Sequence, residues 1–137
     1  MSLFSVFDVA GSALNAQTIR LNTTSSNMAN ANSVSSSTNN LYKARHPVFA
    51  PLVKAFSDDP AAKGVRVMGI VESQAPARQE YSPDNPMANA QGYVFMPNVN
   101  VIDEMADMIS ASRSYQANVE IMNSAKQMMM RTLAIGQ

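Results

Sequence analysis

The strongest pattern in the chain is a seven-residue repeat of apolar positions in its C-terminal part, residues 98–137. Apolar side chains at this spacing form one continuous stripe along a helix, and a narrow stripe of this kind packs against another helix. The helix would hold roughly 35 residues and reach about 50 Å, too long for a compact domain of this size to wrap. The repeat consists of two rows, four residues apart: Val101, Met108, Tyr115, Met122 and Met129, then Met105, Ser112, Val119, Lys126 and Leu133.

Both ends of this segment carry signals for the start or the end of a helix. Asn100 can cap the first turn together with Asp103, three residues later. Asp103, Glu104 and Asp107 lie near the positive end of the helix dipole, and this placement accounts for them without a catalytic role. Gly136 is suited to end the helix. The sequence therefore predicts one helix between Asn100 and Gly136.

The first 30 residues show the same alternation of three- and four-residue steps and predict a second long helix, with Ser5 and Asp8 as a first-turn cap. Its other faces are polar but almost uncharged, whereas a solvated helix face usually carries Glu and Lys. This composition favours contact with protein on more than one side, the alternative being a merely solvated face. The row that defines the helix comprises Leu3, Phe7, Ala10, Leu14, Gln17, Leu21, Thr24 and Met28.

Four positions in these rows are polar: Gln17, Thr24, Ser112 and Lys126. They mark either places where the stripe turns out of the interface or buried polar groups that fix the register of packed helices. The pattern leaves both interpretations open.

The middle of the chain has a different character. Residues 22–40 are mostly Ser, Thr and Asn, which compete with helix, so we expect the first helix to end between Asn30 and Ser33 and a mobile loop to follow to Asn40. All seven prolines lie between residues 47 and 97, among short apolar or alternating runs. These runs predict two or three short strands, at Val48–Phe56, Val65–Val71 and Tyr93–Met96, with a turn at Asp58-Asp59-Pro60.

The expected fold is mainly α. Two long terminal helices pack antiparallel in a coiled-coil-like layer, with a small β-rich insertion between them. Residues 1–32 form the N-terminal helix segment and residues 98–137 the C-terminal one, while 33–97 form the Ser/Asn-rich loop and the β-rich middle segment.

Composition excludes several classes of protein. The ten basic and ten acidic side chains cancel and form no block of like charge, so nucleic acid is not an expected partner. The longest apolar run, Val48 to Val53, is far shorter than a membrane span, so no direct membrane insertion is expected. The N-terminus has no early Lys or Arg and carries Asp8, which makes it a poor secretory signal. Only 15% of residues are charged, and this fits a surface that is meant to be covered.

The residues offer little for chemistry. His46 is the only histidine, and neither an orienting carboxylate nor a nucleophile is arranged beside it. The chain has no Cys, so too few ligands remain for a metal site, and Asp58-Asp59 is better explained as a turn. The five glycines form no phosphate-binding loop. We therefore expect no catalytic residue, no metal and no cofactor, and a protein that is not an enzyme.

Two segments resemble the flagellar rod and hook axial protein family. The first is carried by Ala13-Leu14, Gln17, Arg20-Leu21-Asn22 and Ser26-Asn27-Met28-Ala29-Asn30-Ala31-Asn32. The second is carried by Gly92-Tyr93-Val94, Met96-Pro97-Asn98-Val99, Glu104-Met105, Ser110-Ala111-Ser112-Arg113-Ser114-Tyr115-Gln116-Ala117-Asn118 and Gly136-Gln137.

The resemblance implies a structural subunit of the bacterial flagellar basal body. Such a subunit is exported by the flagellar type III apparatus without a cleaved signal peptide, and it polymerises helically into the proximal rod that spans the periplasm. The rod transmits torque from motor to hook and encloses the export channel, with the terminal helices as its inner layer. The implied partners are further copies of the chain, other rod proteins such as FlgB, FlgF and FlgG, the basal adaptor FliE and the export apparatus.

We therefore expect subunit interfaces on both helices. An alternative is a soluble coiled-coil adaptor or chaperone that binds a partner helix without polymerising, which would form a discrete oligomer. The expected interface residues are Phe7, Ala10, Leu14, Gln17, Leu21, Asn27, Met28 and Asn30 on the N-terminal helix, and Val101, Met105, Met108, Ser112, Tyr115, Val119, Met122, Met129 and Leu133 on the C-terminal helix.

Overall fold

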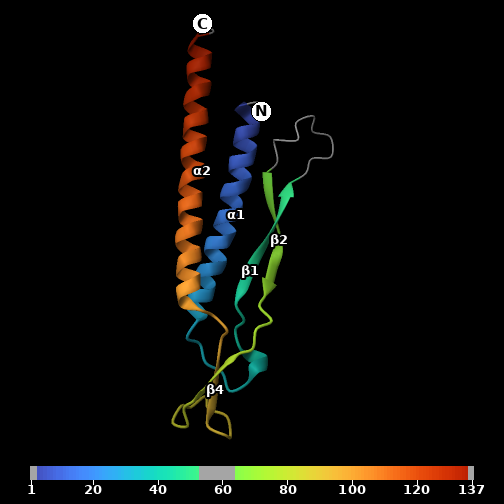
Figure 1. The fold of residues 1–137 in the computed structure, drawn as a ribbon, viewed down its shortest axis with the longest axis vertical. Coiled ribbons are helices and arrows are strands. Elements are labelled where there is room, and N and C mark those ends of the chain that lie inside the picture. Colours follow the sequence, from blue (N-terminus) through green and yellow to red (C-terminus); the bar gives the residue numbers. More distant parts are fainter. Residues whose placement is uncertain (1–2, 53–63, 136–137) are drawn as a thin grey trace.

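Two long helices and two small antiparallel sheets make up the described part of the chain, residues 3–52 and 64–135, in the computed structural model (Figure 1). Helix α1 spans Leu3–Asn30 and helix α2 spans Val101–Ile135. The molecule is elongated, with the end of α2 and the β3–β4 sheet at opposite ends of its long axis (Figure 1). Between the helices lie a short 3-10 helix, Thr38–Asn40, and the strands β1 (Arg45–Leu52), β2 (Gly64–Glu72), β3 (Arg78–Tyr81) and β4 (Tyr93–Met96).

Helices α1 and α2 lie side by side and run antiparallel (Figure 1). Two polar contacts fix their relative direction. Asn27 Nδ2 donates to Glu104 Oε1 at 2.9 Å, and Arg20, two turns earlier in α1, pairs with Asp107, one turn later in α2, at 2.6 Å. The expected architecture of two terminal helices with a small β-rich insertion is therefore confirmed.

The start of α2 follows the sequence closely. Asn100 Oδ1 accepts from the Ile102 amide at 3.1 Å, and its Nδ2 donates to Asp103 Oδ2 at 2.8 Å. The cap at Asn100 is therefore confirmed. The cap expected at Ser5 is wrong, because α1 already begins at Leu3 and Ser5 lies inside it. The stop expected at Gly136 lies outside the described residues.

Strands β1 and β2 form an antiparallel ribbon that packs along α1. Ser12 on α1 joins the two elements, because its Oγ accepts from the Val65 amide at 3.0 Å and donates to the Val9 carbonyl at 2.7 Å. A Cβ at Gly64 would stand 2.6 Å from that oxygen, so any larger residue here would displace the Ser12 side chain. The expected strand at 65–71 is confirmed and extends by one residue at each end.

The first strand begins earlier than its pattern indicated. It starts at Arg45 instead of Val48, and residues 53–56 and the turn at 58–60 lie outside the described part of the chain. The register shifts between Val48 and Phe49, because Met68 of β2 has no partner in β1.

Strands β3 and β4 form the second sheet, at the end of the molecule opposite the termini (Figure 1). The strand at Tyr93–Met96 matches its expected bounds. Strand β3 was missed, since Arg78-Gln79-Glu80-Tyr81 is exposed throughout and lacks an apolar face. Segment 33–40 was expected to be a mobile loop, but Ser35 pairs with Phe95 of β4 through two backbone bonds of 3.0 Å.

The core of the described chain is small and rich in alanine. The buried apolar residues include Val94 and Val99, and the others are Ala10, Ala16, Ala31, Ala44, Ala111 and Ala125. Many larger apolar side chains are exposed, chiefly on α2 and on the β1–β2 ribbon. Alanine lets two helices approach closely but removes little apolar surface from water, so hydrogen bonds contribute much of the order at the places where elements meet.

Helix α2 is also longer than its partner. It has 35 residues and α1 has 28, and its C-terminal end extends beyond the described start of α1 (Figure 1). We call residues 129–135 the α2 overhang; it adds about 10 Å at one end of the molecule.

Candidate functional site

Asn27 is the centre of a polar junction where α1, α2 and β1 meet. Its side chain is fully buried. The Oδ1 atom accepts from the Tyr42 hydroxyl at 2.7 Å and from the Arg45 amide at 2.9 Å. The Nδ2 atom donates to the Arg45 carbonyl at 2.8 Å and to Glu104 Oε1 at 2.9 Å. The amide thus uses both donors and two acceptor sites, and it pairs with Arg45 as a neighbouring strand would.

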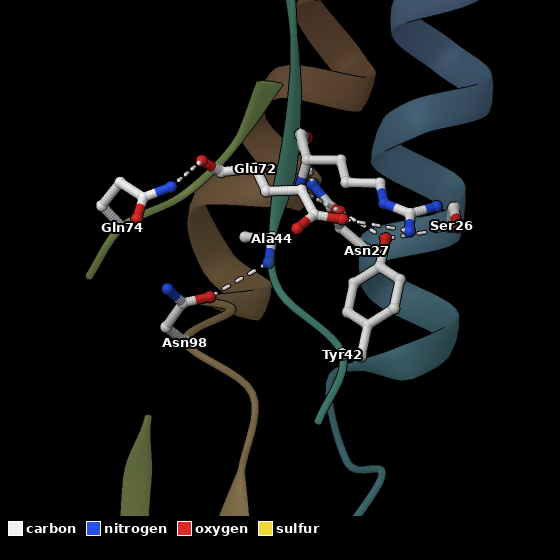
Figure 2. A network of polar contacts seen from close by, with 8 residues as sticks. Ser26, Asn27, Tyr42, Ala44, Glu72, Gln74 and Asn98 are labelled. Atoms are coloured by element: carbon white, nitrogen blue, oxygen red, sulfur yellow. Dashed lines mark hydrogen bonds and ion pairs between the residues drawn. The ribbon is translucent and has the colours of Figure 1, made fainter. Parts of the chain in front are cut away.

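Asn98 binds the backbone of Ala44, the residue before Arg45, in a similar way. Its Oδ1 accepts from the Ala44 amide at 3.0 Å, while Nδ2 donates to the Ala75 carbonyl at 2.7 Å and lies 3.2 Å from Ser73 Oγ. Figure 2 shows the two asparagines on opposite sides of the chain that leads into β1. The junction therefore joins the segment before α2 to both the start of β1 and the end of β2.

Glu104 is the ionisable member of the junction. Its side chain is 4% exposed, Oε1 accepts from Asn27, and Oε2 has no hydrogen-bond partner in the described part of the chain. Burial raises the pKa of the Glu104 carboxyl above its ordinary value, although the hydrogen bond from Asn27 and the charge of His46 oppose the rise. From the sequence, Glu104 was assigned to the helix dipole alone, and its role in the junction was missed.

The junction has the properties of a structural joint. His46 lies in β1 with its side chain exposed, and residues 3–52 and 64–135 contain no cluster of three or more acidic or histidine side chains that could hold a metal. In the same ranges no helix is long and apolar enough to cross a membrane. The interactions that the junction provides are hydrogen bonds between elements distant in sequence.

The expected interface residues of α1 all lie at least partly inside the molecule. Ala10 and Asn27 are buried, and the remaining six are half-buried: Phe7, Leu14, Gln17, Leu21, Met28 and Asn30. Helix α1 has α2 on one side and the β1–β2 ribbon on another, so contact on two sides occurs within the chain itself. This contact accounts for the scarcity of charge on its polar faces.

The expected interface residues of α2 are distributed differently. Val101, Met105, Tyr115 and Leu133 are exposed, while the other five are half-buried: Met108, Ser112, Val119, Met122 and Met129. The fully buried residues of α2 are Glu104, Ala111 and Ala125, which belong to a third row with the same seven-residue spacing. Since α1 is the main element that contacts α2, this third row and the Met108 row face α1.

The row from Met105 to Leu133 therefore lies on the flank of α2, beside the contact with α1. The sequence pattern did not indicate this arrangement, because the row that faces α1 consists of small or polar residues. A repeat of alanine at the spacing of Ala111 and Ala125 was the available signal.

The four polar positions in the rows also differ in burial. Thr24 is buried and Gln17 Oε1 is buried without a hydrogen-bond partner among the described residues, whereas Lys126 is exposed and Ser112 is half-buried. Thr24 of α1 contacts Glu104 of α2, whereas Lys126 of α2 is exposed.

Comparison with known proteins follows the same two segments. A family model described as "Flagella basal body rod protein" matches residues 7–35, and one described as "Flagellar basal body rod FlgEFG protein C-terminal" matches residues 90–135. Both matched segments contain an asparagine of the junction, Asn27 in the first and Asn98 in the second.

Several curated relatives are similar over their full length, and they carry the name "Flagellar basal-body rod protein FlgC". The protein from Escherichia coli O6:H1 is 52% identical over 137 residues, and that from Salmonella typhimurium LT2 is 51% identical, each alignment covering 100% of both chains. The protein from Borreliella burgdorferi is 37% identical over 151 residues, covering 100% of this chain and 99% of the relative.

Proposed function

The chain belongs to the FlgC family of flagellar basal-body rod proteins, and from this membership we propose that it polymerises with its neighbours into the proximal rod. It is a structural rod subunit and not an enzyme. In the proposed assembly the rod transmits torque from motor to hook, encloses the export channel and is required for motility. The discrete adaptor considered as an alternative receives no support from the names of the relatives.

The observation that carries the proposal is the excess of surface on the single chain. It exposes 9319 Å². A compact monomer of 14.8 kDa is expected to expose about 7,000 Å², roughly 2,300 Å² less. Because a standard interface buries about 800 Å² on each partner, the elongated chain has surface for contacts with more than one neighbour. An open helical polymer provides several neighbours to every subunit.

The apolar character of the exposed surface supports the same proposal. On α2, the flank that does not face α1 carries Met105 and Ile109, which are 49% and 53% exposed. Because alanine dominates the interior, larger apolar side chains are available to contacts between subunits. We assign the α2 part of the interface to this flank and to the edge of the Met108 row, with Val101, Met105, Met108, Ser112, Tyr115, Val119, Met122, Met129 and Leu133 as its members.

Helix α1 contributes less surface than α2 to the proposed subunit interface. Its side chains are mostly half-buried by α2 and the ribbon, so neighbours would contact only their remaining surface. We assign to this part Phe7, Ala10, Leu14, Gln17, Leu21, Asn27, Met28 and Asn30. Ala10 and Asn27, which are buried within the chain, act by fixing the position of the helix.

In this proposal residues 1–32 and 98–137 form the inner, coiled-coil-like helical layer of the rod, and residues 33–97 lie outside it. The partners are further copies of the chain, the rod proteins FlgB, FlgF and FlgG, the adaptor FliE and the type III export apparatus. The rod spans the periplasm, and the subunit reaches it without a cleaved signal peptide.

Cross-linking and mass spectrometry of detergent-extracted basal bodies from the source cell test the proposal. We expect peptides of this chain among the rod proteins, cross-linked to other subunits through residues 5–30 and 101–134. A cell that lacks the gene should lose swimming and regain it when the gene is returned. A soluble oligomer of fixed size, absent from basal bodies, would contradict the proposal.

A further inference from the structure

The two ends of the long axis carry complementary features that the side-by-side packing of helices does not use. At one end the α2 overhang extends past α1, and at the other lie the β3–β4 sheet and the segments that pack against it (Figure 1). An elongated subunit in a rod has neighbours above and below as well as beside it, so the chemistry of these ends decides how subunits stack.

The α2 overhang is apolar and basic. Met130 is 63% exposed and Leu133 68% exposed, and their spacing of three places them on the same face of the helix. No acidic residue follows Glu120, whereas Lys126 and Arg131 do follow it. The last turn of a helix also leaves carbonyl oxygens without intrahelical partners. A binding partner for this end must therefore supply apolar walls and hydrogen-bond donors.

The opposite end contains a hollow with these properties. Its volume is about 390 Å³, within the range of sites that enclose several side chains. Its walls include Leu41, Tyr42, Pro76 and Phe95, and its polar lining includes Lys43 and Gln79. The side chains of Lys43 and Gln79 are exposed and make no hydrogen bond to any described residue, so they are available to carbonyl oxygens.

Charge is complementary in the lining of the hollow. Lys43 is the one charged residue among the described residues of that lining, and a cation is stabilising beside the C-terminal end of a helix, where the helix dipole is negative. Glu80 and Asp84 are exposed on β3 and on the turn that follows it, and they do not line the hollow.

From these features, and on the basis of the proposed function, we infer that the hollow between residues 38–43, 75–79 and β4 receives the C-terminal end of the α2 helix of an adjoining rod subunit of this family. The contact is head-to-tail, because each subunit presents a helix end at one pole and a hollow at the other. It orders subunits along the rod axis, while the flank of α2 orders them around it.

Site-specific photo-cross-linking tests the inference on assembled basal bodies. The chain has no cysteine, so Gln79→Cys introduces a single thiol at the wall of the hollow for a benzophenone maleimide. Met68→Cys is the matched control, because Met68 is 59% exposed and lies on the β1–β2 ribbon, away from the hollow. After irradiation, we expect the Gln79→Cys adduct to join the last two turns of the C-terminal helix of another rod subunit, and the Met68→Cys adduct not to.

The outcomes separate the two proposals. Swimming cells whose Gln79→Cys rods link to a different element, or link no more to a helix end than Met68→Cys does, would overturn the inference and leave the rod function intact. Basal bodies without the chain would overturn the rod function and the inference together. A link from Gln79→Cys to the helix end, in swimming cells whose Met68→Cys rods form none, supports the contact.

Discussion

Asn27 and Asn98 bind consecutive peptide units of the chain, one through the amide of Arg45 and the other through the amide of Ala44. The first asparagine comes from α1 and the second from the segment just before α2. The two residues are 71 positions apart in sequence. Because both bind the segment that leads into β1, they hold the C-terminal part of α1 and the segment before α2 against the start of this strand.

Replacement of Asn27 by Ala should destabilise the folded chain substantially. The variant leaves the Arg45 amide and carbonyl, the Tyr42 hydroxyl and Glu104 without their partner. Since each buried polar group left unpaired costs about 1–3 kcal/mol and some will find water, we expect a loss of about 3 kcal/mol. Urea unfolding followed by circular dichroism measures this loss. The control is Asn22→Ala, an exposed site on α1, and an equal loss in both variants would contradict the role of Asn27.

Replacement of Glu104 by Gln should increase stability at neutral pH. Burial raises the pKa of Glu104 in the folded state, so the favourable contribution of this group is fully present below its ordinary value of 4.5 and is lost as pH rises through the raised value. Glutamine keeps an acceptor for Asn27 and carries no charge, so it removes that loss.

The measurement is the free energy of unfolding from pH 4 to pH 8. We expect the advantage of Glu104→Gln over the natural chain to grow with pH and to disappear at the acidic end. Glu120→Gln, at an exposed position of α2, serves as the control. Parallel pH profiles for the natural chain and Glu104→Gln would contradict the assignment.

Replacement of Gly64 by Ala should loosen the β1–β2 ribbon from α1. The new methyl group would stand 2.6 Å from Ser12 Oγ, so the hydrogen bond to the Val65 amide must lengthen or break. We expect a loss of about 1–3 kcal/mol. Gly69→Ala is the control within the same strand, because no atom lies within 4 Å of its added Cβ. The cost should fall when Ser12→Ala is already present, and a cost that does not change would exclude this contact as the cause.

Replacement of Met105 by Asp should stop rod assembly without unfolding the chain. Met105 is 49% exposed on the flank of α2, so the monomer tolerates the charge, whereas a covered interface would bury it without a partner. Swimming and recovery of basal bodies are the measurements. Ala106→Asp adds the same charge one residue later at another exposed position, and we expect it to swim. Normal motility of Met105→Asp would remove this flank from the interface.

Replacement of Leu133 by Asp should also abolish swimming, because the α2 overhang would lose the apolar side chain that is expected to contact Leu41, Tyr42 and Phe95 of the hollow. Thr132→Asp is the matched control, since Thr132 is exposed and lies on a different face of the same turn. Circular dichroism should show unchanged helix content in both variants. If Leu133→Asp swims as well as Thr132→Asp, the apolar face of the overhang is not an interface.

Local signals in the sequence predicted the elements well. The helix repeats located α1 and α2, Asn100 with Asp103 marked the start of α2, and the residues of β4 matched their expected bounds. Strand β3 could not be found in this way, because Arg78-Gln79-Glu80-Tyr81 is stabilised as a strand by its partner β4 and not by an apolar face.

The relative rotation of the helices was harder to predict. The most apolar pair of rows on α2 was taken as the interface, but half of that pair lies on the flank, and the buried row contains Glu104, Ala111 and Ala125. The junction was missed for a related reason. The hydrogen bonds of Asn27 and Asn98 join residues far apart in sequence, and no periodic pattern records them.

The hydrogen bonds of Asn98 to Ala44 and of Asn27 to Arg45 have a mechanical consequence. When a rod of such subunits turns under load, the helical layer and the β1–β2 ribbon experience different forces, and the hydrogen bonds of the polar junction fasten the two together. Twisting stress is then shared among several parallel bonds on two successive peptide units, which must break together before the ribbon can slip along the helices. We therefore expect the stiffness of the subunit under torsion to depend on these two asparagine side chains.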